Sequence, residues 1–155
     1  MKDPESCITD IWLADDDPED CWLFNEAIRQ SLPQAVLTCF HNGYDLMAML
    51  KSDRKPDILF LDLVMPQKDG FDCLKEIRKE LHLLRLPIIV FTDLVQQQYI
   101  DMACEFGANL YFAKPFNFKH LVSGIQSFLK IDWNNPSGIT SQQINRKFVS
   151  YDRLL

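Results

Sequence analysis

Short apolar runs alternate along the chain with longer stretches in which apolar residues recur every three or four positions. The runs predict buried strands, and the stretches predict helices with one apolar face. The predicted strands are residues 11–14, 35–40, 58–61, 87–91 and 109–112. The residues that share an apolar helical face are Leu23, Ala27 and Ile28; Phe71, Leu74, Ile77 and Leu81; Ile100, Ala103 and Phe106; and Leu121, Ile125, Phe128 and Leu129, with 43–51 as a shorter candidate helix.

Strands that alternate with helices in this way predict a parallel sheet with helices on both faces, which is an α/β fold. In open sheets of this kind, ligands bind beyond the carboxyl ends of the strands, near the point where the strand order reverses. The residues that end or follow the predicted strands are therefore the candidates for a functional site.

Most of these strand-end residues are acidic or hydroxylic. The acidic and hydroxylic ones are Asp15, Asp16 and Asp17 after the first strand, Asp62 after the third and Thr92 at the end of the fourth. The fifth strand is followed by a lysine, Lys114. Adjacent carboxylates repel one another, so a cation among them would explain the grouping. Carboxylates from different strands favour a hard cation such as Mg²⁺, and an aspartate can itself be phosphorylated. A metal ion, a lysine and a hydroxyl are the groups that neutralise a phosphoryl group during its transfer.

Taken singly, each of these residues also has a simpler interpretation. Asp17, followed by Pro18 and two further acids, is typical of a helix start with a cap and a proline in the first turn. Asp62 at the end of an apolar run also fits a solvated turn. Lys114 before Pro115 also fits the protein surface. The residue types alone leave these alternatives open.

Composition and charge narrow the class of protein. The 155 residues suit one domain with a sizeable core. The net charge of −6 and the pI near 5.0 argue against a general attraction to nucleic acid or to an anionic membrane. No apolar run approaches the roughly 18 residues that span a bilayer. The five cysteines lack metal-ligand spacing, and without a basic and apolar leader they favour reduced thiols in the cytoplasm.

Four segments in sequence order carry a family resemblance. They read "LADDDPED", "LDLVMPQKDGFD", "IVFTD" and "GANLYFAKPF". With them the chain, over residues 8–130, resembles the receiver domain of response regulators. The resemblance implies a flavodoxin-like, doubly wound sheet of five parallel strands in the order 2-1-3-4-5, with helices on both faces. It places a receiver domain at 1–131 and leaves an extension at 132–155, whose apolar residues predict docking on its own domain or on a second copy.

The resemblance also assigns roles to the acids. It implies that Asp62 accepts a phosphoryl group from a histidine kinase or a histidine phosphotransfer protein. Mg²⁺ would be bound by Asp16, Asp62 and the backbone carbonyl of Val64, with Asp15 acting through water.

Further roles follow for residues of the last two strands. Thr92 and Lys114 would bind oxygens of the phosphoryl group. Tyr111 occupies the position of an aromatic switch that is coupled to Thr92, although a simple packed aromatic residue is the alternative. The Lys114–Pro115 peptide bond would be cis.

The resemblance places the output surface on the fourth helix, the fifth strand and the fifth helix. Val95 and Tyr99 lie there near Tyr111 and would bind a downstream protein partner or a second copy in a homodimer. Asp93 stands where the family usually has a small residue, and a carboxylate there would repel the incoming phosphodonor. Asp93 and Gln96 also form a capping-box pattern, so we expect Asp93 to cap the fourth helix.

The side chains two positions after Asp62 and two after Thr92 predict slow loss of the phosphoryl group. In similar domains these positions flank the water that attacks the phosphoryl group. Here they are Val64 and Leu94, which can neither donate nor accept a hydrogen bond. Since in-line alignment of the water is most of the catalysis, we expect both side chains to slow hydrolysis.

The preferred function is therefore a phosphorylation-dependent signalling switch rather than an enzyme. One alternative is a phosphorylation-independent adaptor with a receiver fold. Another is a phosphatase with an aspartate nucleophile, but such enzymes need a second aspartate at position 64, which is a valine here. A DNA-binding regulator is disfavoured because residues 132–155 are too few for a recognition domain and the net charge is negative.

Overall fold

The structure, a computed structural model, describes residues 7–134 of the chain. Its strands are β1 (Asp10–Ala14), β2 (Val36–Phe40), β3 (Ile58–Leu61), β4 (Ile88–Thr92) and β5 (Leu110–Ala113). All neighbouring strands pair in parallel, and the sheet has the order β2-β1-β3-β4-β5. This order confirms the predicted fold class, and it reverses between β1 and β3.

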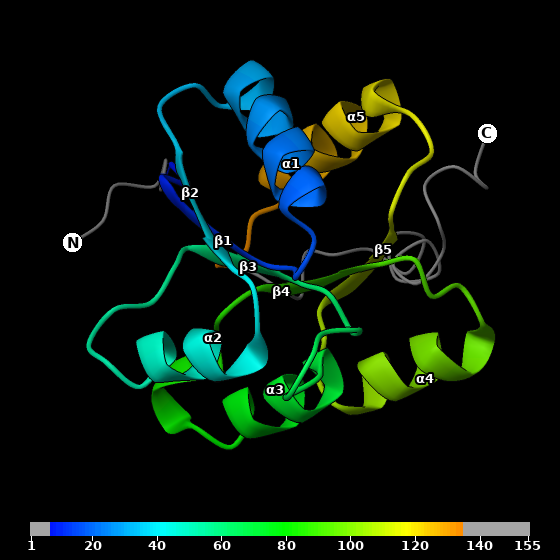
Figure 1. The fold of residues 1–155 in the computed structure, drawn as a ribbon. Coiled ribbons are helices and arrows are strands. Elements are labelled where there is room, and N and C mark those ends of the chain that lie inside the picture. Colours follow the sequence, from blue (N-terminus) through cyan, green and yellow to red (C-terminus); the bar gives the residue numbers. More distant parts are fainter. Residues whose placement is uncertain (1–6, 135–155) are drawn as a thin grey trace.

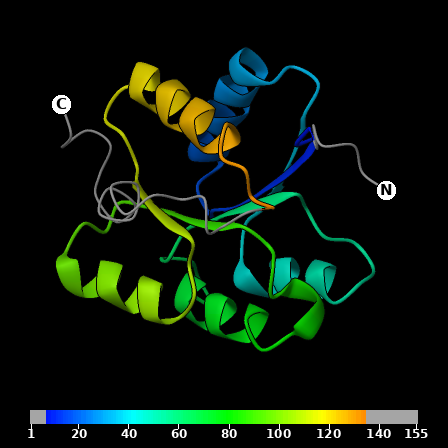
Figure 2. The ribbon, with the colours of Figure 1, turned by 180° about the vertical axis from the view of Figure 1, so that it is seen from behind.

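Helices cover both faces of the sheet. The helices are α1 (Pro18–Ser31), α2 (Gly43–Leu50), α3 (Gly70–Ile77), α4 (Gln97–Glu105) and α5 (Phe118–Leu129), with a short 3₁₀ turn, η1 (Leu81–Leu83), after α3. Helices α1 and α5 lie on one face, and α2, α3 and α4 lie on the other (Figures 1 and 2). Within the described residues, none of the helices combines the length and the apolar character that a membrane crossing requires.

The inner strands β1, β3 and β4 and the edge strand β5 bury side chains on both of their faces, whereas the edge strand β2 is largely half-buried or exposed. In β1, Ile11 and Leu13 pack into the core beneath α1 and α5, while Trp12 and Ala14 pack beneath α2, α3 and α4. Successive side chains of a strand point to opposite faces, so a strand between two helical layers has few positions for a polar residue. Polar residues therefore appear where the strands end, which is where the sequence places its acids.

Helix α1 begins as the sequence predicts. Pro18 is its first residue, and the side chain of Asp17 accepts a hydrogen bond from the amide of Glu19 at 2.9 Å. The interpretation of Asp17 as a helix cap is thereby confirmed. Three residues separate the end of β1 from the start of the helix, so the first turn of α1 lies at the edge of the sheet where the acids gather.

The predicted start of the fourth helix is wrong. Helix α4 begins at Gln97, Gln96 makes no side-chain capping hydrogen bond, and Asp93 is exposed in the preceding loop. The hydroxyl of Tyr111 donates to the backbone carbonyl of Leu94 at 2.7 Å. The loop before α4 is therefore bonded to β5, a contact that the local capping pattern does not report.

The prediction that Leu81 lies on the buried face of the third helix is also wrong. Helix α3 ends at Ile77, and Leu81 is 85% exposed in η1. The chain turns at Arg78, whose guanidinium donates to the carbonyls of Gly107 at 2.9 Å and Leu83 at 3.0 Å. These bonds hold the loop after α3 against the loop before β5, which a longer helix could not do.

The expected cis bond before Pro115 is wrong as well. No peptide bond of the described residues is cis, so Lys114 and Pro115 are joined by a trans bond. The trans isomer of a bond before proline is favoured intrinsically by about 0.5–1 kcal/mol. Lys114 reaches the acids at the sheet edge with this isomer.

The expected docking of the extension at 132–155 concerns residues that from 135 onward lie outside the described part of the chain. At the start of the extension, Trp133 packs against the core beneath α1 and α5. Its indole N–H donates to the carbonyl of Phe128 at 3.1 Å.

Candidate functional site

The sheet itself fixes the backbone of the candidate residues. The amide of Asp15 donates to the carbonyl of Phe40 at 2.9 Å, one residue beyond the end of β1. The amide of Asp62 donates to the carbonyl of Ala14 at 2.9 Å, one residue beyond the end of β3. The amide of Lys114 continues β5 in the same way, with a 2.8 Å bond to the last residue of β4. The parallel ladders thus deliver all three side chains to one edge.

Three carboxylates meet at this edge. Oxygens of Asp15, Asp16 and Asp62 lie within 4.8 Å of one another. Asp15 is fully buried, Asp62 is 5% exposed and Asp16 is exposed to solvent. Clustered carboxylate oxygens with one solvent-facing member fit a hard divalent cation that keeps some of its waters. We call these three residues the acid cluster.

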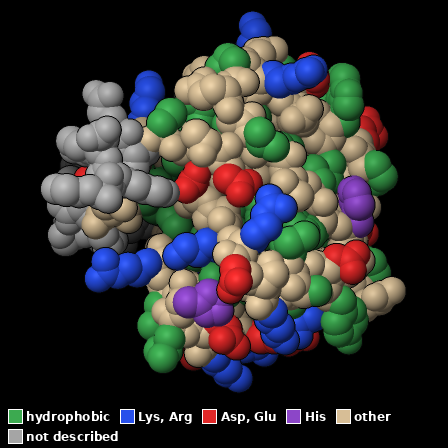
Figure 3. Space-filling model, turned by 90° about the vertical axis from the view of Figure 1, so that its left-hand side faces the viewer, with side chains coloured by type: hydrophobic (Ala, Val, Ile, Leu, Met, Phe, Trp, Pro, Cys, Tyr) green, Lys and Arg blue, Asp and Glu red, His purple; other side chains and the backbone are tan. Residues whose placement is uncertain are grey.

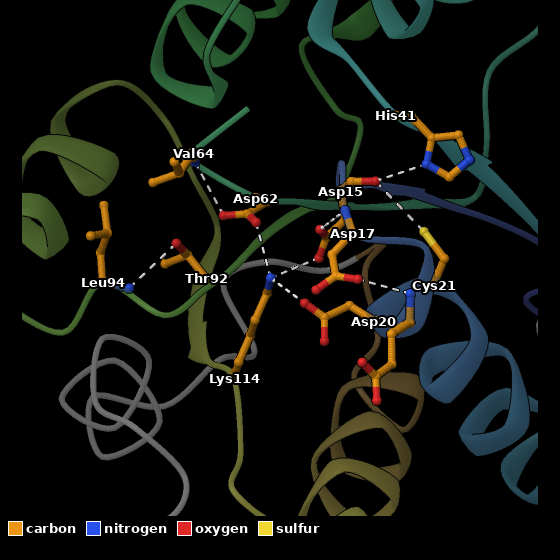
Figure 4. Close-up of polar contacts among 11 residues, drawn as sticks. Asp15, Asp17, Asp20, Cys21, His41, Asp62, Val64, Thr92, Leu94 and Lys114 are labelled. Carbon is orange, nitrogen blue, oxygen red and sulfur yellow. Dashed lines mark hydrogen bonds and ion pairs between the residues drawn. The ribbon is translucent and has the colours of Figure 1, made fainter. Parts of the chain in front are cut away.

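The side chain of Lys114 points toward Asp15 and Asp62 of the acid cluster (Figure 4). Its Nζ lies 2.8 Å from Oδ2 of Asp15 and 3.0 Å from Oδ2 of Asp62. It also lies 2.8 Å from Oδ2 of Asp20, in the first turn of α1. The contacts with Asp20 and Asp62 are hydrogen bonds, whereas that with Asp15 is an ion pair.

Burial shapes the protonation of this group of charges. Burial raises the pKa of Asp15 to about 6, although contacts with Lys114 and with the amide of Asp17 oppose that rise. Burial alone would lower the pKa of Lys114, but its contacts with Asp15 and Asp20 and the charge of Asp62 raise it above its usual range. Lys114 therefore stays charged, and the site without metal holds more negative than positive charge.

Asp20 is the site residue that sequence reasoning missed. In the sequence, Asp20 looks like one of the acidic residues that stabilise the first turn of a helix. The argument from the sheet edge considers only residues at the ends of strands, so it does not include Asp20. A signal was present in the sequence, because a cap at Asp17 starts α1 directly beside the acids. The first turn must then lie at the same edge, and Asp20 faces the same lysine.

Thr92 and Tyr111 both contact the backbone of Leu94. Thr92 is fully buried at the end of β4, and its hydroxyl accepts a weak hydrogen bond from the Leu94 amide at 3.4 Å. Tyr111 is 2% exposed, and its hydroxyl donates to the Leu94 carbonyl. Burial raises the pKa of the Tyr111 hydroxyl. The loop after β4 is thus the physical link between the two residues predicted to form the switch.

The loop after β3 orients Asp62. The amide of Val64 donates to Oδ1 of Asp62 at 3.1 Å, and the Val64 side chain is 58% exposed above the site. Val64 as a metal ligand through its carbonyl stays a prediction. Farther along, a Cβ on Gly70 would lie 2.1 Å from the backbone oxygen of Asp62. Only glycine permits this approach, which closes the loop against the acid cluster.

Elsewhere the surface carries charges of both signs. On the face shown in Figure 3, Lys and Arg side chains are interspersed with Asp and Glu side chains. This face therefore presents no continuous basic surface of the kind that tracks a nucleic acid backbone.

Comparison with known proteins identifies the family to which the chain is similar. The family model described as the response regulator receiver domain matches residues 11–126. The chain is 31% identical over 137 residues to the response regulator Rcp1 of Synechocystis sp. (strain ATCC 27184 / PCC 6803 / Kazusa), which covers 83% of this chain and 93% of that protein. It is 35% identical over 120 residues to the transcriptional regulatory protein CpxR of Klebsiella pneumoniae subsp. pneumoniae (strain HS11286), covering 77% of this chain but only 49% of CpxR.

Solved structures agree with these relatives. The phosphorylated cyanobacterial phytochrome response regulator RcpA superimposes with a TM-score of 0.72 at 27% identity, covering 78% of this chain and 91% of that one. The Mn²⁺-bound form of response regulator Rcp1 superimposes with a TM-score of 0.70 at 28% identity, covering 77% and 91%.

The excess of negative charge leads to a prediction for Asp15→Asn. In buffer with a chelator at about pH 7.5, this variant should raise the free energy of unfolding by about 1–2 kcal/mol, because it removes a buried charge from a cluster with surplus carboxylates. With the folded pKa of Asp15 raised from 3.8 to about 6, the folded protein binds a proton more tightly than the unfolded chain. The cost of the Asp15 charge is therefore full above pH 6 and disappears toward pH 3.8, so the gain should shrink over that window.

Urea unfolding at several pH values measures this difference. The exposed Asp53 provides the control, and Asp53→Asn should change stability by less than about 0.5 kcal/mol. A gain that does not vary with pH, or a loss of stability near neutral pH, would contradict the prediction.

Proposed function

The chain belongs to the response regulator receiver domain family of two-component signalling, and from this membership we propose that it is a phosphorylation-dependent switch with Asp62 as phosphoacceptor. The observation that carries the proposal is the position of Asp62 in the acid cluster, 3.0 Å from Nζ of Lys114. The phosphoryl donor is a histidine kinase or a histidine phosphotransfer protein.

A divalent cation fits the acid cluster, and we propose that it is Mg²⁺. Asp16, Asp62 and the carbonyl of Val64 would hold it directly, with Asp15 acting through water. When bound, it supplies positive charge that stabilises the oxygens of the transferring phosphoryl group. The oxygen donors of the cluster and the Mn²⁺-bound form of Rcp1 support a divalent metal here.

The residues of this chain then share the work of the transfer. A carboxylate oxygen of Asp62 forms a bond to phosphorus as the donor's bond to phosphorus breaks, and the leaving nitrogen of the donor retains the electron pair. Lys114 neutralises one phosphoryl oxygen, and the hydroxyl of Thr92 donates a hydrogen bond to another. Because these groups are already positioned by the strand ends, little reorganisation is needed.

The same residues carry the signal outward. Thr92 contacts the Leu94 amide, and Tyr111 contacts the Leu94 carbonyl. When the Thr92 hydroxyl turns to the phosphoryl group, it releases the loop after β4 and changes the packing of Tyr111. The surface of α4, β5 and α5 would then bind a downstream protein or a second copy of the chain.

Two alternatives fit the site less well. An adaptor that ignores phosphorylation would have no need of the acid cluster, Thr92 and Lys114 together. A phosphatase would require an acid or base two residues after Asp62, where this chain has the exposed Val64.

The free thiols of all five cysteines support a cytoplasmic location for the switch.

Loss of the phosphoacceptor tests the proposal directly. With Mg²⁺ and acetyl phosphate, the wild type should gain one phosphoryl group on residue 62, detected by mass spectrometry. Asp62→Asn should gain none, because an amide is not a nucleophile toward the donor. Asp53→Asn, which keeps the acid cluster intact, should be modified like the wild type. A wild type that stays unmodified, or an Asp62→Asn variant that is modified equally, would refute the proposed function.

The phosphoryl group should be lost slowly because the side chains beside it are apolar. The double variant Val64→Asn with Leu94→Glu should lose it about ten- to a hundredfold faster, roughly 1.4–2.7 kcal/mol of barrier, because polar groups can align the attacking water. The decay of phosphorylated protein after removal of the donor gives the rate. Val36→Asn is the control. Val36 is 64% exposed, compared with 58% for Val64, and it lies at the opposite end of the sheet, so this variant should leave the rate of phosphoryl loss unchanged. Equal decay of the double variant and the wild type would show that these two side chains do not limit hydrolysis.

The output surface can be tested at Tyr99, which is partly buried and packs 6.2 Å from the ring of Phe71. Tyr99→Glu should weaken association of the phosphorylated chain by about tenfold, because a charge replaces an aromatic anchor, while phosphoryl uptake is retained. Sedimentation velocity reports the association of copies, and co-purification reports a partner. Tyr44→Glu on α2, where the tyrosine is 58% exposed, is the matched control. Parallel loss of uptake and association in Tyr99→Glu would argue against this surface.

A further inference from the structure

Lys114 has one carboxylate partner that does not belong to the acid cluster. Asp15 and Asp62 are members of the cluster, whereas Asp20 is not. Asp20 nevertheless approaches Nζ of Lys114 as closely as Asp15 does, at 2.8 Å. It comes from α1 rather than from a strand end, and its side chain is 28% exposed while that of Lys114 is 11% exposed.

A bound divalent cation changes what each partner can offer the lysine. The cation and the ammonium draw on the same carboxylates, those of Asp15 and Asp62, and the two positive charges repel each other in a partly buried site. Asp20 is the contact of Lys114 in Figure 4 that a cation in the acid cluster does not compete for. It can therefore keep neutralising the ammonium after the metal has entered.

We propose that Asp20 is a positioning residue that holds Lys114 beside the acid cluster and so lets the lysine and a divalent cation occupy the site together. The inference rests on the proposed function, since it assigns a partner to the lysine that contacts the phosphoryl group. Asp20 acts through Lys114 and contacts neither the metal nor the phosphoryl group itself.

The local structure makes Asp20 a firm support. It lies in the first turn of α1, which is fixed by the Asp17 cap and by the 3.2 Å bond from the amide of Cys21 to the carbonyl of Asp17. The side chain of aspartate is short, so a fixed helical turn leaves its carboxylate little freedom. On its other side, the ammonium lies 5.6 Å from the centre of the Phe91 ring. The lysine is thus held between α1 and the end of β4.

Metal binding tests the inference without relying on phosphorylation. The full chain is titrated with Mn²⁺, and free Mn²⁺ is measured by electron paramagnetic resonance. Asp20→Asn should weaken Mn²⁺ binding by about three- to tenfold, within the usual range for coupled charges in contact. The lysine, having lost its outer partner, then competes with the metal for Asp15 and Asp62. Asp20→Ser removes the same charge and should behave alike, whereas Asp20→Glu should restore most of the affinity.

Asp17→Asn is the matched control. It removes an equal charge from the same helix start, and asparagine still caps the helix. Solvent screening of this exposed group should limit its effect to less than about twofold. If Asp20→Asn weakens Mn²⁺ binding no more than Asp17→Asn does, the inference is overturned, because the effect would then be one of net charge.

A double-mutant cycle with Lys114→Gln decides whether the effect passes through the lysine. In the Lys114→Gln background, Asp20→Asn should change Mn²⁺ affinity no more than Asp17→Asn does. An undiminished effect of Asp20→Asn in that background would overturn the inference. Failure of the wild type to take up a phosphoryl group from acetyl phosphate would refute the proposed function instead, and the Mn²⁺ cycle would still decide the role of Asp20.

Discussion

The ion contacts of the Lys114 ammonium hold together a group of charges that repel one another. Four carboxylates, those of Asp15, Asp16, Asp20 and Asp62, share one edge of the sheet with a single lysine. The backbone ladders force two of these acids into burial, because each continues its strand by one residue. Three contacts to one ammonium offset part of the cost of that burial, and the charge that remains gives the site its preference for a cation.

The partial neutralisation of the carboxylates by Lys114 explains how the site can destabilise the fold and still bind a cation. A fully neutralised cluster would be more stable, but it would have no affinity for a metal. A cluster without the lysine would have four charges with no fixed partner. The arrangement with one ammonium lies between these limits, and it leaves negative charge that a divalent cation can neutralise.

The sequence predicted the parts of the fold that follow from local pattern and strand ends. Strands buried on both faces have continuous apolar runs, and the first polar residue after each run is at the sheet edge, so Asp15, Asp62 and Lys114 could be placed together. The Asp17 cap is equally local. The contact between Asp20 and Lys114 spans 94 positions and joins a helix to a strand end, which no period in the sequence reports. The loop before α4 is likewise bonded to a residue outside it, Tyr111, 17 positions along the chain from Leu94, and the local capping pattern at Asp93 does not report that contact.

The close approach of Gly70 to the carbonyl of Asp62 has a consequence for how this chain can vary in length. The loop between them closes on itself through the 3.0 Å bond from the Gly70 amide to the Leu63 carbonyl, and it turns at Gln67, whose φ of 69° is left-handed. An inserted or deleted residue would shift Gly70 out of contact and move the carboxylate it supports. Insertions are tolerable instead in exposed segments such as 51–55, between α2 and β3. The spacing from 62 to 70 is therefore as much a part of the site as the side chains that line it.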